Sequence, residues 1–313
     1  MSRALAFVAL IALAHPASAQ EPSFKSTSSE LVVLPVLVTD RPDHYVPDLA
    51  REQFTVYDNG RRVPLEFFSA EDTPVTVGLV IDSSSSMRHK LGDVIAGAAA
   101  FARASNEDDE FFALSFNDEV REVTPAGAFL AAHDQPALNR AFASLLAEGR
   151  TSMYDALIEG LNRLKGGTRP RHALVLVSDG GDNASSADLE RVLAAARSSN
   201  AAIYTIGIFD EFDLEKNPKV LKALASATGG ERFLPRSAGA LVQTCLQIAR
   251  EIRQGYTLAY EPPDRDGAFH RIRVEATGTG GRKLNVRTRP GYFAARETAD
   301  RSEETARRSG QPK

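Results

Sequence analysis

The sequence predicts an α/β fold with a doubly wound, mainly parallel sheet, joined to a small all-β, sandwich-like domain built from both flanks of the chain. Between residues 74 and 253, short apolar runs alternate with helical patterns, which is typical of a parallel sheet covered by helices on both faces. The segments before and after it alternate apolar and polar residues between turn signals, as half-exposed strands do. Hydroxyl and carboxylate side chains follow the central apolar runs, at the sheet edge where such folds bind ligands.

The central region divides into strands and helices that follow one another in order. Its first apolar run, 75–81, is short and rich in β-branched residues, so we expect a fully buried strand. Further strands are predicted at 110–116, 172–178, 203–208 and 232–234, with a hairpin partner at 120–123. Helices are predicted at 91–104, 136–147, 153–165, 187–198, 218–227 and 238–253. This order predicts one domain over residues 74–253.

The two flanks carry strand patterns that need partners. Strands are predicted at 31–39, 54–57 and 62–68, and after the central region at 256–260, 270–276 and 283–288. The pair Asn59-Gly60 is the strongest short hairpin signal, and Pro35 and Pro64 are restricted to edges or bulges. A few strands alone are marginally stable in water. We therefore expect residues 28–72 and 255–293 to complete one β-rich domain.

The two ends of the chain read as segments outside these domains. Residues 1–19 combine a basic start, a short apolar stretch and the small-x-small pattern of Ala17-Ser18-Ala19, which predicts a secretory signal peptide. No transmembrane segment is expected in the mature chain, which we expect to be exported to the periplasm, the cell surface or the medium. Residues 294–313 lose apolar content and predict a disordered tail.

Composition excludes two classes of protein. The net charge of −4 argues against a nucleic-acid partner, which would favour a basic surface. The single cysteine, Cys245, excludes an internal disulfide framework and lies in an apolar helical pattern, where a buried thiol is expected.

Polar side chains converge at the predicted carboxyl edge of the sheet. Asp82, Ser84 and Ser86 follow the first strand, Thr151 precedes a helix, and Asp179 follows the strand 172–178. Carboxylate and hydroxyl oxygens are hard ligands, which suit Mg²⁺, Ca²⁺ or Mn²⁺ better than zinc or copper. The alternative for the first loop is an ordinary turn that caps the next helix, because Ser and Asp are preferred there.

This set of residues resembles the metal-ion-dependent adhesion site of von Willebrand factor type A domains, with Asp82-x-Ser84-x-Ser86, Thr151 and Asp179 in Ser-Asp-Gly as the matching pieces. The resemblance covers about residues 74–253. It departs from the family pattern at Ser85, where glycine is usual. It implies that the two serines and the threonine bind Mg²⁺ (or Ca²⁺ or Mn²⁺), that the aspartates bind directly or through water, and that an acidic side chain of a protein partner completes the coordination.

The order of segments also resembles exported bacterial proteins of this superfamily, so we expect a secreted protein-binding module and no enzyme. Asp155 and Asp182 are either supports of the site or, more simply, helix-end and turn residues. One rival is a metal-dependent hydrolase that uses Asp82 or Ser84, although no histidine lies in a nucleophile-elbow context. Another is a structural scaffold whose site is unused.

Overall fold

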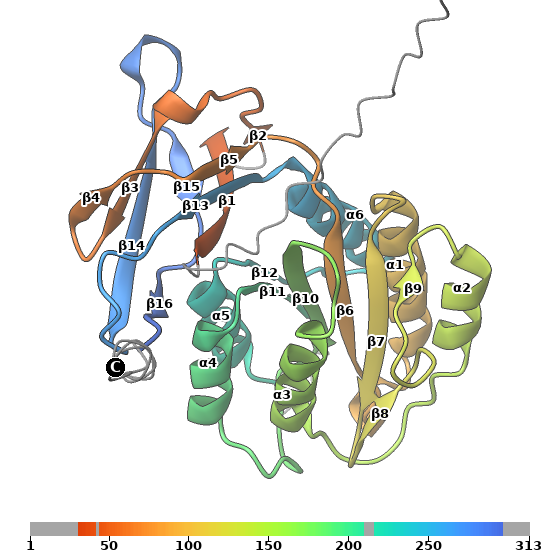
Figure 1. Ribbon diagram of the computed structural model, residues 1–313. Coiled ribbons are helices and arrows are strands. Elements are labelled where there is room, and N and C mark those ends of the chain that lie inside the picture. The colour runs from red at the N-terminus through yellow and green to blue at the C-terminus, as the bar shows by residue number, and fades with distance from the viewer. Residues whose placement is uncertain (1–30, 42–43, 210–215, 297–313) are drawn as a thin grey trace, which may run out of the picture.

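The computed structural model describes residues 31–41, 44–209 and 216–296, so the predicted signal peptide and most of the predicted tail lie outside it. It contains an α/β domain beside a β domain (Figure 1). Ala294 is buried and Arg296 forms a β-bridge with Asp266, so the β domain continues to residue 296. The predicted fold class is confirmed.

The α/β domain is organised around a seven-stranded sheet with the order β12-β11-β10-β6-β7-β8, in which β9 pairs with β7 along the same edge as β8. The first five of these strands are parallel, whereas β8 and β9 run antiparallel to β7. The sheet strands are β6 (Val75–Asp82), β7 (Glu110–Phe116), β8 (Val120–Glu122), β9 (Leu130–Ala131), β10 (Arg171–Ser178), β11 (Ala201–Gly207) and β12 (Arg232–Phe233). Every residue of β6 and β7 is buried, as expected for strands covered on both faces.

In the part of the chain that the structure describes, six α-helices cover the sheet in two layers (Figure 1). They are α1 (Leu91–Ala104), α2 (Gln135–Ala143), α3 (Met153–Leu164), α4 (Leu189–Ser198), α5 (Pro218–Thr228) and α6 (Ala238–Gln254). One face of the sheet packs with α1, α2 and α6 in a core that includes Phe101 and Cys245. The other face packs with α3, α4 and α5 around Leu174 and Leu224. The buried thiol of Cys245 therefore matches its prediction.

The helix predicted over 136–147 is too long, because α2 ends at Ala143. The residues after α2 are held in a non-helical conformation by hydrogen bonds to the loop after β6. The Glu148 amide donates to the Ser83 carbonyl over 2.9 Å, and the Ser85 amide donates to the Gly149 carbonyl over 3.1 Å. The local helical pattern is thus overridden by contacts with the loop after β6.

The β domain joins both flanks of the chain, as predicted, in two antiparallel sheets. One has the order β15-β1-β13-β5, with β2 paired to β1, and the other has the order β16-β14-β3-β4. Leu34 and Leu258 of the first sheet and Val56 of the second belong to one buried core. The strands are β1 (Val32–Arg41), β2 (His44–Tyr45), β3 (Phe54–Asp58), β4 (Arg61–Val63), β5 (Phe67–Ser69), β13 (Tyr256–Tyr260), β14 (Phe269–Ala276), β15 (Asn285–Arg287) and β16 (Gly291–Phe293).

The single strand predicted over 62–68 is wrong. The structure has two strands there, β4 and β5, because the chain leaves one sheet and enters the other. Pro64 has no amide hydrogen to continue the β3–β4 ladder, and the Arg51 guanidinium donates to the Leu65 carbonyl. The Glu66 amide then donates to the Ala259 carbonyl, which starts the pairing of β5 with β13. The predicted turn at Asn59-Gly60 is confirmed, with φ of 46° and 83° at its two residues, as a type I′ hairpin requires.

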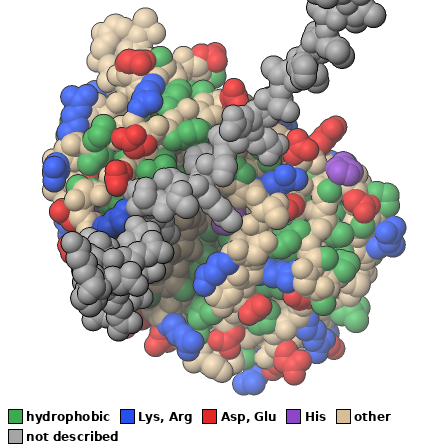
Figure 2. Space-filling model, viewed as in Figure 1, with side chains coloured by type: hydrophobic (Ala, Val, Ile, Leu, Met, Phe, Trp, Pro, Cys, Tyr) green, Lys and Arg blue, Asp and Glu red, His purple; other side chains and the backbone are tan. Residues whose placement is uncertain are grey.

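The surface seen in Figure 2 mixes acidic and basic side chains, with no large field of one sign. Over the described ranges 31–41, 44–209 and 216–296, no helix is both long enough and apolar enough to cross a membrane.

Candidate metal site

The predicted ligand residues lie in three loops at the carboxyl edge of the parallel sheet. Asp82 is the last residue of β6, and β10, which ends at Ser178 just before Asp179, pairs with β6 in parallel from Arg171 to Val177. The two strands therefore end side by side and bring their aspartates to the same edge. Asp82, Ser84 and Asp179 are at most 2% exposed, whereas Ser86 is exposed. The loop that follows β6 is therefore open to solvent at Ser86.

A continuous chain of hydrogen bonds joins four of the five predicted ligands. The Ser84 amide donates to Asp82 Oδ1 over 2.9 Å, and the Ser84 and Ser86 hydroxyl oxygens are 3.0 Å apart. The Ser86 hydroxyl donates to Asp179 Oδ2 over 2.7 Å. These contacts bring the oxygens of the first loop and of the loop after β10 together.

Thr151, the fifth predicted ligand, reaches the same edge through its backbone. It is 4% exposed, its amide donates to the Asn183 side-chain oxygen over 2.9 Å, and its carbonyl accepts from the Asn183 and Ala184 amides. The contact between Gly149 and Ser85 ties its loop to the first loop. Among the described residues, the Thr151 hydroxyl forms no hydrogen bond with the other four predicted ligands, so its place in the set rests on these backbone contacts.

Ser85, where the family usually has glycine, does not disturb this loop. Its φ is not positive, since Asp48 and Asn59 are the only non-glycine residues with positive φ in the described chain. The residue lies in a short 3-10 helix, Ser85–Met87, which a residue with a Cβ atom can form. The departure from the family pattern therefore has no conformational cost.

The electrostatics of the site favour a bound cation. Burial raises the pKa of Asp82 to about 6; bonds from Ser84 and Ser178 lower it, and the neighbouring charge of Asp179 raises it. No Lys, Arg or His of the described residues forms an ion pair with either aspartate. The raised pKa shows that the buried Asp82 carboxylate is costly in the ionised state, and a divalent cation would relieve that cost.

The donor chemistry fits a hard cation. The site offers two carboxylates and three hydroxyls, which suits Mg²⁺ in particular, because Mg²⁺ commonly binds one or two carboxylates and keeps other oxygens around it. No group of three or more His, Cys, Asp and Glu residues suited to a metal exists among the described residues. A metal here would therefore depend on the hydroxyls of Ser84, Ser86 and Thr151 as much as on the aspartates.

Other residues hold the site and were not predicted. Ser178 donates its hydroxyl to Asp82 Oδ2 over 2.7 Å and accepts from the Gly180 amide. Gly180 has a φ of 82°, and a Cβ there would lie 2.7 Å from the Asn217 carbonyl oxygen. Ser178 and Gly180 stand beside Asp179 in the sequence, so the Ser-Asp-Gly motif was the available signal. Asn183 had no such signal, because its role depends on Thr151, a residue 32 positions away.

Asp155 and Asp182 bind loop backbone and, within the described chain, form no hydrogen bond with the predicted ligands. Asp182 accepts from the Tyr154 amide over 2.8 Å and from the Ser185 hydroxyl over 2.6 Å. Asp155 accepts from the Ser186 and Ala187 amides. Both therefore dock the loop after β10 onto the beginning of α3. This agrees with the simpler interpretation of the two aspartates as helix-end and turn residues.

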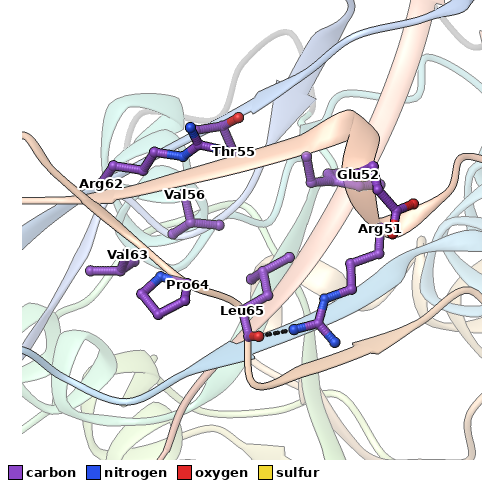
Figure 3. Close-up of a pocket in the computed structure, with 9 residues that line it drawn as sticks. Arg51, Glu52, Thr55, Val56, Arg62, Val63, Pro64 and Leu65 are labelled. Atoms are coloured by element: carbon purple, nitrogen blue, oxygen red, sulfur yellow. Dashed lines mark hydrogen bonds between the residues drawn. The ribbon is translucent and has the colours of Figure 1, made fainter.

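A cavity of about 560 Å³ lies away from this edge, in the β domain. Arg51, Phe54, Arg62, Val63 and Leu65 are among its lining residues (Figure 3). It contains none of the predicted ligands, and Glu52 is the single carboxylate in its lining. It offers no pair of acid and base for catalysis.

Comparison with known proteins defines the class of this fold and site. A model of the von Willebrand factor type A domain matches residues 76–244, more than half of the chain. The chain therefore belongs to this family.

Solved structures with the same fold are distant in sequence. A von Willebrand factor type A protein from Catenulispora acidiphila is 16% identical, with a TM-score of 0.53 over 89% of this chain and 76% of that one. The corresponding domain of the type V pili tip protein Mfa5 from Porphyromonas gingivalis is 17% identical, with a TM-score of 0.48 over 59% of this chain and 98% of that one. No curated protein sequence matches the chain. At these identities the likeness concerns the fold alone.

Proposed function

We propose that the protein is an exported binding module that holds a divalent cation, Mg²⁺ in the first place, and captures an acidic side chain of a protein partner. The observation that supports this most is the hydrogen-bond chain from Asp82 through Ser84 and Ser86 to Asp179, at the open edge of a von Willebrand factor type A domain. Asp82, Ser84, Ser86, Thr151 and Asp179 would hold the cation.

The role of each residue follows from its chemistry. Three of the five proposed ligands are neutral hydroxyls, so the two aspartates would balance the charge of the cation without adding a surplus of negative charge. The cation would supply Lewis acidity toward an outside carboxylate, whose oxygen is a good hard ligand. Exposure of Ser86 beside the buried aspartates leaves one side of the set accessible to such a partner.

The rival class is a hydrolase, in which a serine nucleophile would usually be activated by a histidine. Within the described chain, no histidine is hydrogen-bonded to Ser84 or Ser86. The Ser84 and Ser86 hydroxyls instead contact each other and Asp179. We therefore propose a binding function, and metal-dependent turnover of model esters or phosphates that is lost in Asp82→Asn would favour the hydrolase.

The test is a pull-down of extracellular proteins of the source cells on immobilised protein, with Mg²⁺ or with a chelator. The expected result is a partner retained with Mg²⁺, released by chelator and lost on Ser86→Ala, an exposed site that tolerates substitution. Ser144→Ala, which removes an exposed hydroxyl bonded to Ala141, is the matched control. Partners that bind equally with chelator and on Ser86→Ala would contradict the proposal.

A further inference from the structure

A small cavity lies at the junction of the two domains, at the opposite edge of the parallel sheet from the candidate metal site. Its volume is about 20 Å³, enough for one water-sized particle. Arg171 is the first residue of β10, Gly255 connects α6 to β13, and Val36 belongs to β1. These three residues line the cavity, so it is shared by both domains.

Arg171 is a buried cation without a partner in this cavity. It is 6% exposed, and its Nη1 atom is buried without a hydrogen-bond acceptor among the described residues. No carboxylate in the described ranges lies within 4.0 Å of its nitrogens. Burial lowers the pKa of the guanidinium, whereas the charges of Tyr204, Asp72 and Asp109, which form no ion pair with it, raise the pKa. Arginine remains protonated in proteins, so Arg171 keeps its charge while its Nη1 donor has no acceptor in the described chain.

The carboxylate that shares the cavity with Arg171 is bound to other groups. Glu251 also lines the cavity, but its carboxylate already accepts bonds from Tyr45, Gln247 and Arg287. Arg287 is bound in turn by Glu251 and by Glu231, whose side chain is 47% exposed and therefore solvated. The Nε atom of Arg287 is buried and without an acceptor in the described chain. Two guanidinium groups thus have unused donors in one cavity.

We propose that this cavity binds one small inorganic anion of chloride size against Arg171, which links the start of β10 to the β domain. A volume of about 20 Å³ is too small for larger oxyanions. A wider cavity of about 310 Å³ shares Leu37, Glu251 and Arg287 with it and gives a route to solvent. Gly255 keeps the space open, because a Cβ there would lie 3.1 Å from Arg171 Nη2.

The primary test measures thermal stability at fixed ionic strength while chloride or bromide replaces gluconate, which is too large for the cavity. The wild-type melting temperature is expected to rise saturably with chloride and bromide. Arg171→Met keeps most of the side-chain stem and removes the charge, so its melting temperature should not respond to either halide. Arg250→Met, an exposed arginine on α6, is the matched control and should respond as the wild type does.

A second measurement does not depend on the folding of any variant. Crystals of the wild-type protein grown with bromide are expected to show an anomalous peak beside Arg171. A water in place of the peak, or an equal response of wild type and Arg171→Met to halide, would overturn the proposal. In that case the cavity holds solvent only.

Discussion

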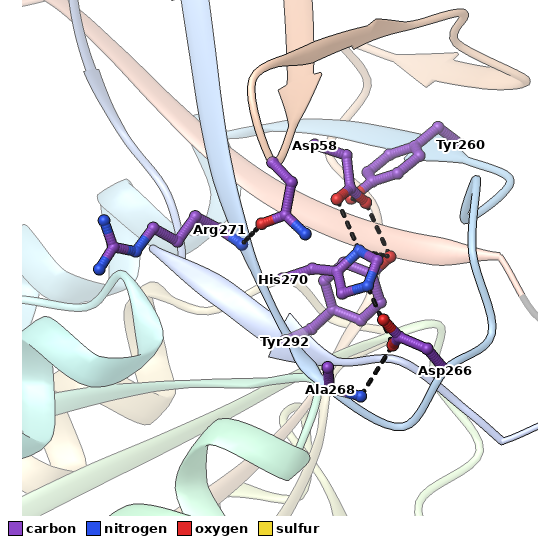
Figure 4. A network of polar contacts seen from close by, with 8 residues as sticks. Asp58, Tyr260, Asp266, Ala268, His270, Arg271 and Tyr292 are labelled. Carbon is purple, nitrogen blue, oxygen red and sulfur yellow. Dashed lines mark hydrogen bonds and ion pairs between the residues drawn. The ribbon is translucent and has the colours of Figure 1, made fainter.

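Replacing His270 by Phe is expected to destabilise the β domain by about 3 kcal/mol at pH 5.5. His270 and Asp58 are 1% exposed, and His270 Nδ1 lies 2.7 Å from Asp58 Oδ1. The Asp58 carboxylate also accepts from Tyr260 over 2.9 Å and Tyr292 over 2.7 Å (Figure 4). Breaking a buried charged pair costs about 3–5 kcal/mol, and the lower end applies because both tyrosines still bind Asp58.

The effect should depend on pH, because the second ring nitrogen, Nε2, faces Asp266 Oδ1 at 3.2 Å. Carboxylates only accept, so the imidazolium alone donates to both. Burial lowers the pKa of His270, but bonds and charges from Asp58 and Asp266 outweigh this, and the pKa is raised. A raised pKa in the folded state means that the stabilisation is fully present below the unfolded value of about 6.5 and is lost as the pH rises through the folded value.

The assay is urea denaturation followed by far-UV circular dichroism at pH 5.5 and 9, since the chain has no tryptophan to report by fluorescence. The difference between wild type and His270→Phe should shrink at pH 9. His133→Phe, at an exposed histidine, is the control and should cost less than about 0.5 kcal/mol. An equal difference at both pH values, or one below about 1 kcal/mol at pH 5.5, would refute the reasoning.

Two further predictions concern the candidate metal site. In thermal denaturation, Gly180→Ala should destabilise the protein by about 2 kcal/mol or more, because φ is 82° and the new Cβ would approach the Asn217 carbonyl. The control is Gly239→Ala, which has open space around it and should be near neutral in the same assay. Asp82→Asn should stabilise the protein in chelator by about 1–3 kcal/mol, because burial raises the Asp82 pKa to about 6 and the ionised form is costly at pH 7. A loss of stability in Asp82→Asn at pH 7 would show that the charge is compensated without a metal.

Local signals predicted much of this fold. The helix Leu91–Ala104 and the hairpin at Asn59-Gly60 are formed as predicted, because apolar spacing and turn chemistry decide them within a few residues. The predicted pairing of the two flanks is also confirmed, although it joins strands about 200 residues apart.

Features that depend on residues far apart in the sequence could not be predicted from these local signals. The end of α2 is fixed by contacts between residues 148–149 and the loop after β6, and the division of 62–68 depends on Ala259 in the far flank. The buried pair of Asp58 and His270 joins residues 212 positions apart, and neither has a local pattern that marks it. Sequence motifs predicted the five residues proposed as ligands, whereas the role of Asn183 depends on its hydrogen bond to Thr151, which no motif indicates.

The most direct test of a divalent-cation site is calorimetric titration of Mg²⁺ and Mn²⁺ into chelator-treated protein, with Asp179→Asn beside it and circular dichroism as the check on folding. Asp134→Asn, which alters the cap of α2 away from the site, is the matched control. The account predicts saturable binding of one ion in wild type and in Asp134→Asn, and its loss in Asp179→Asn. Absence of binding in the wild-type protein, or equal affinity in Asp179→Asn, would contradict it.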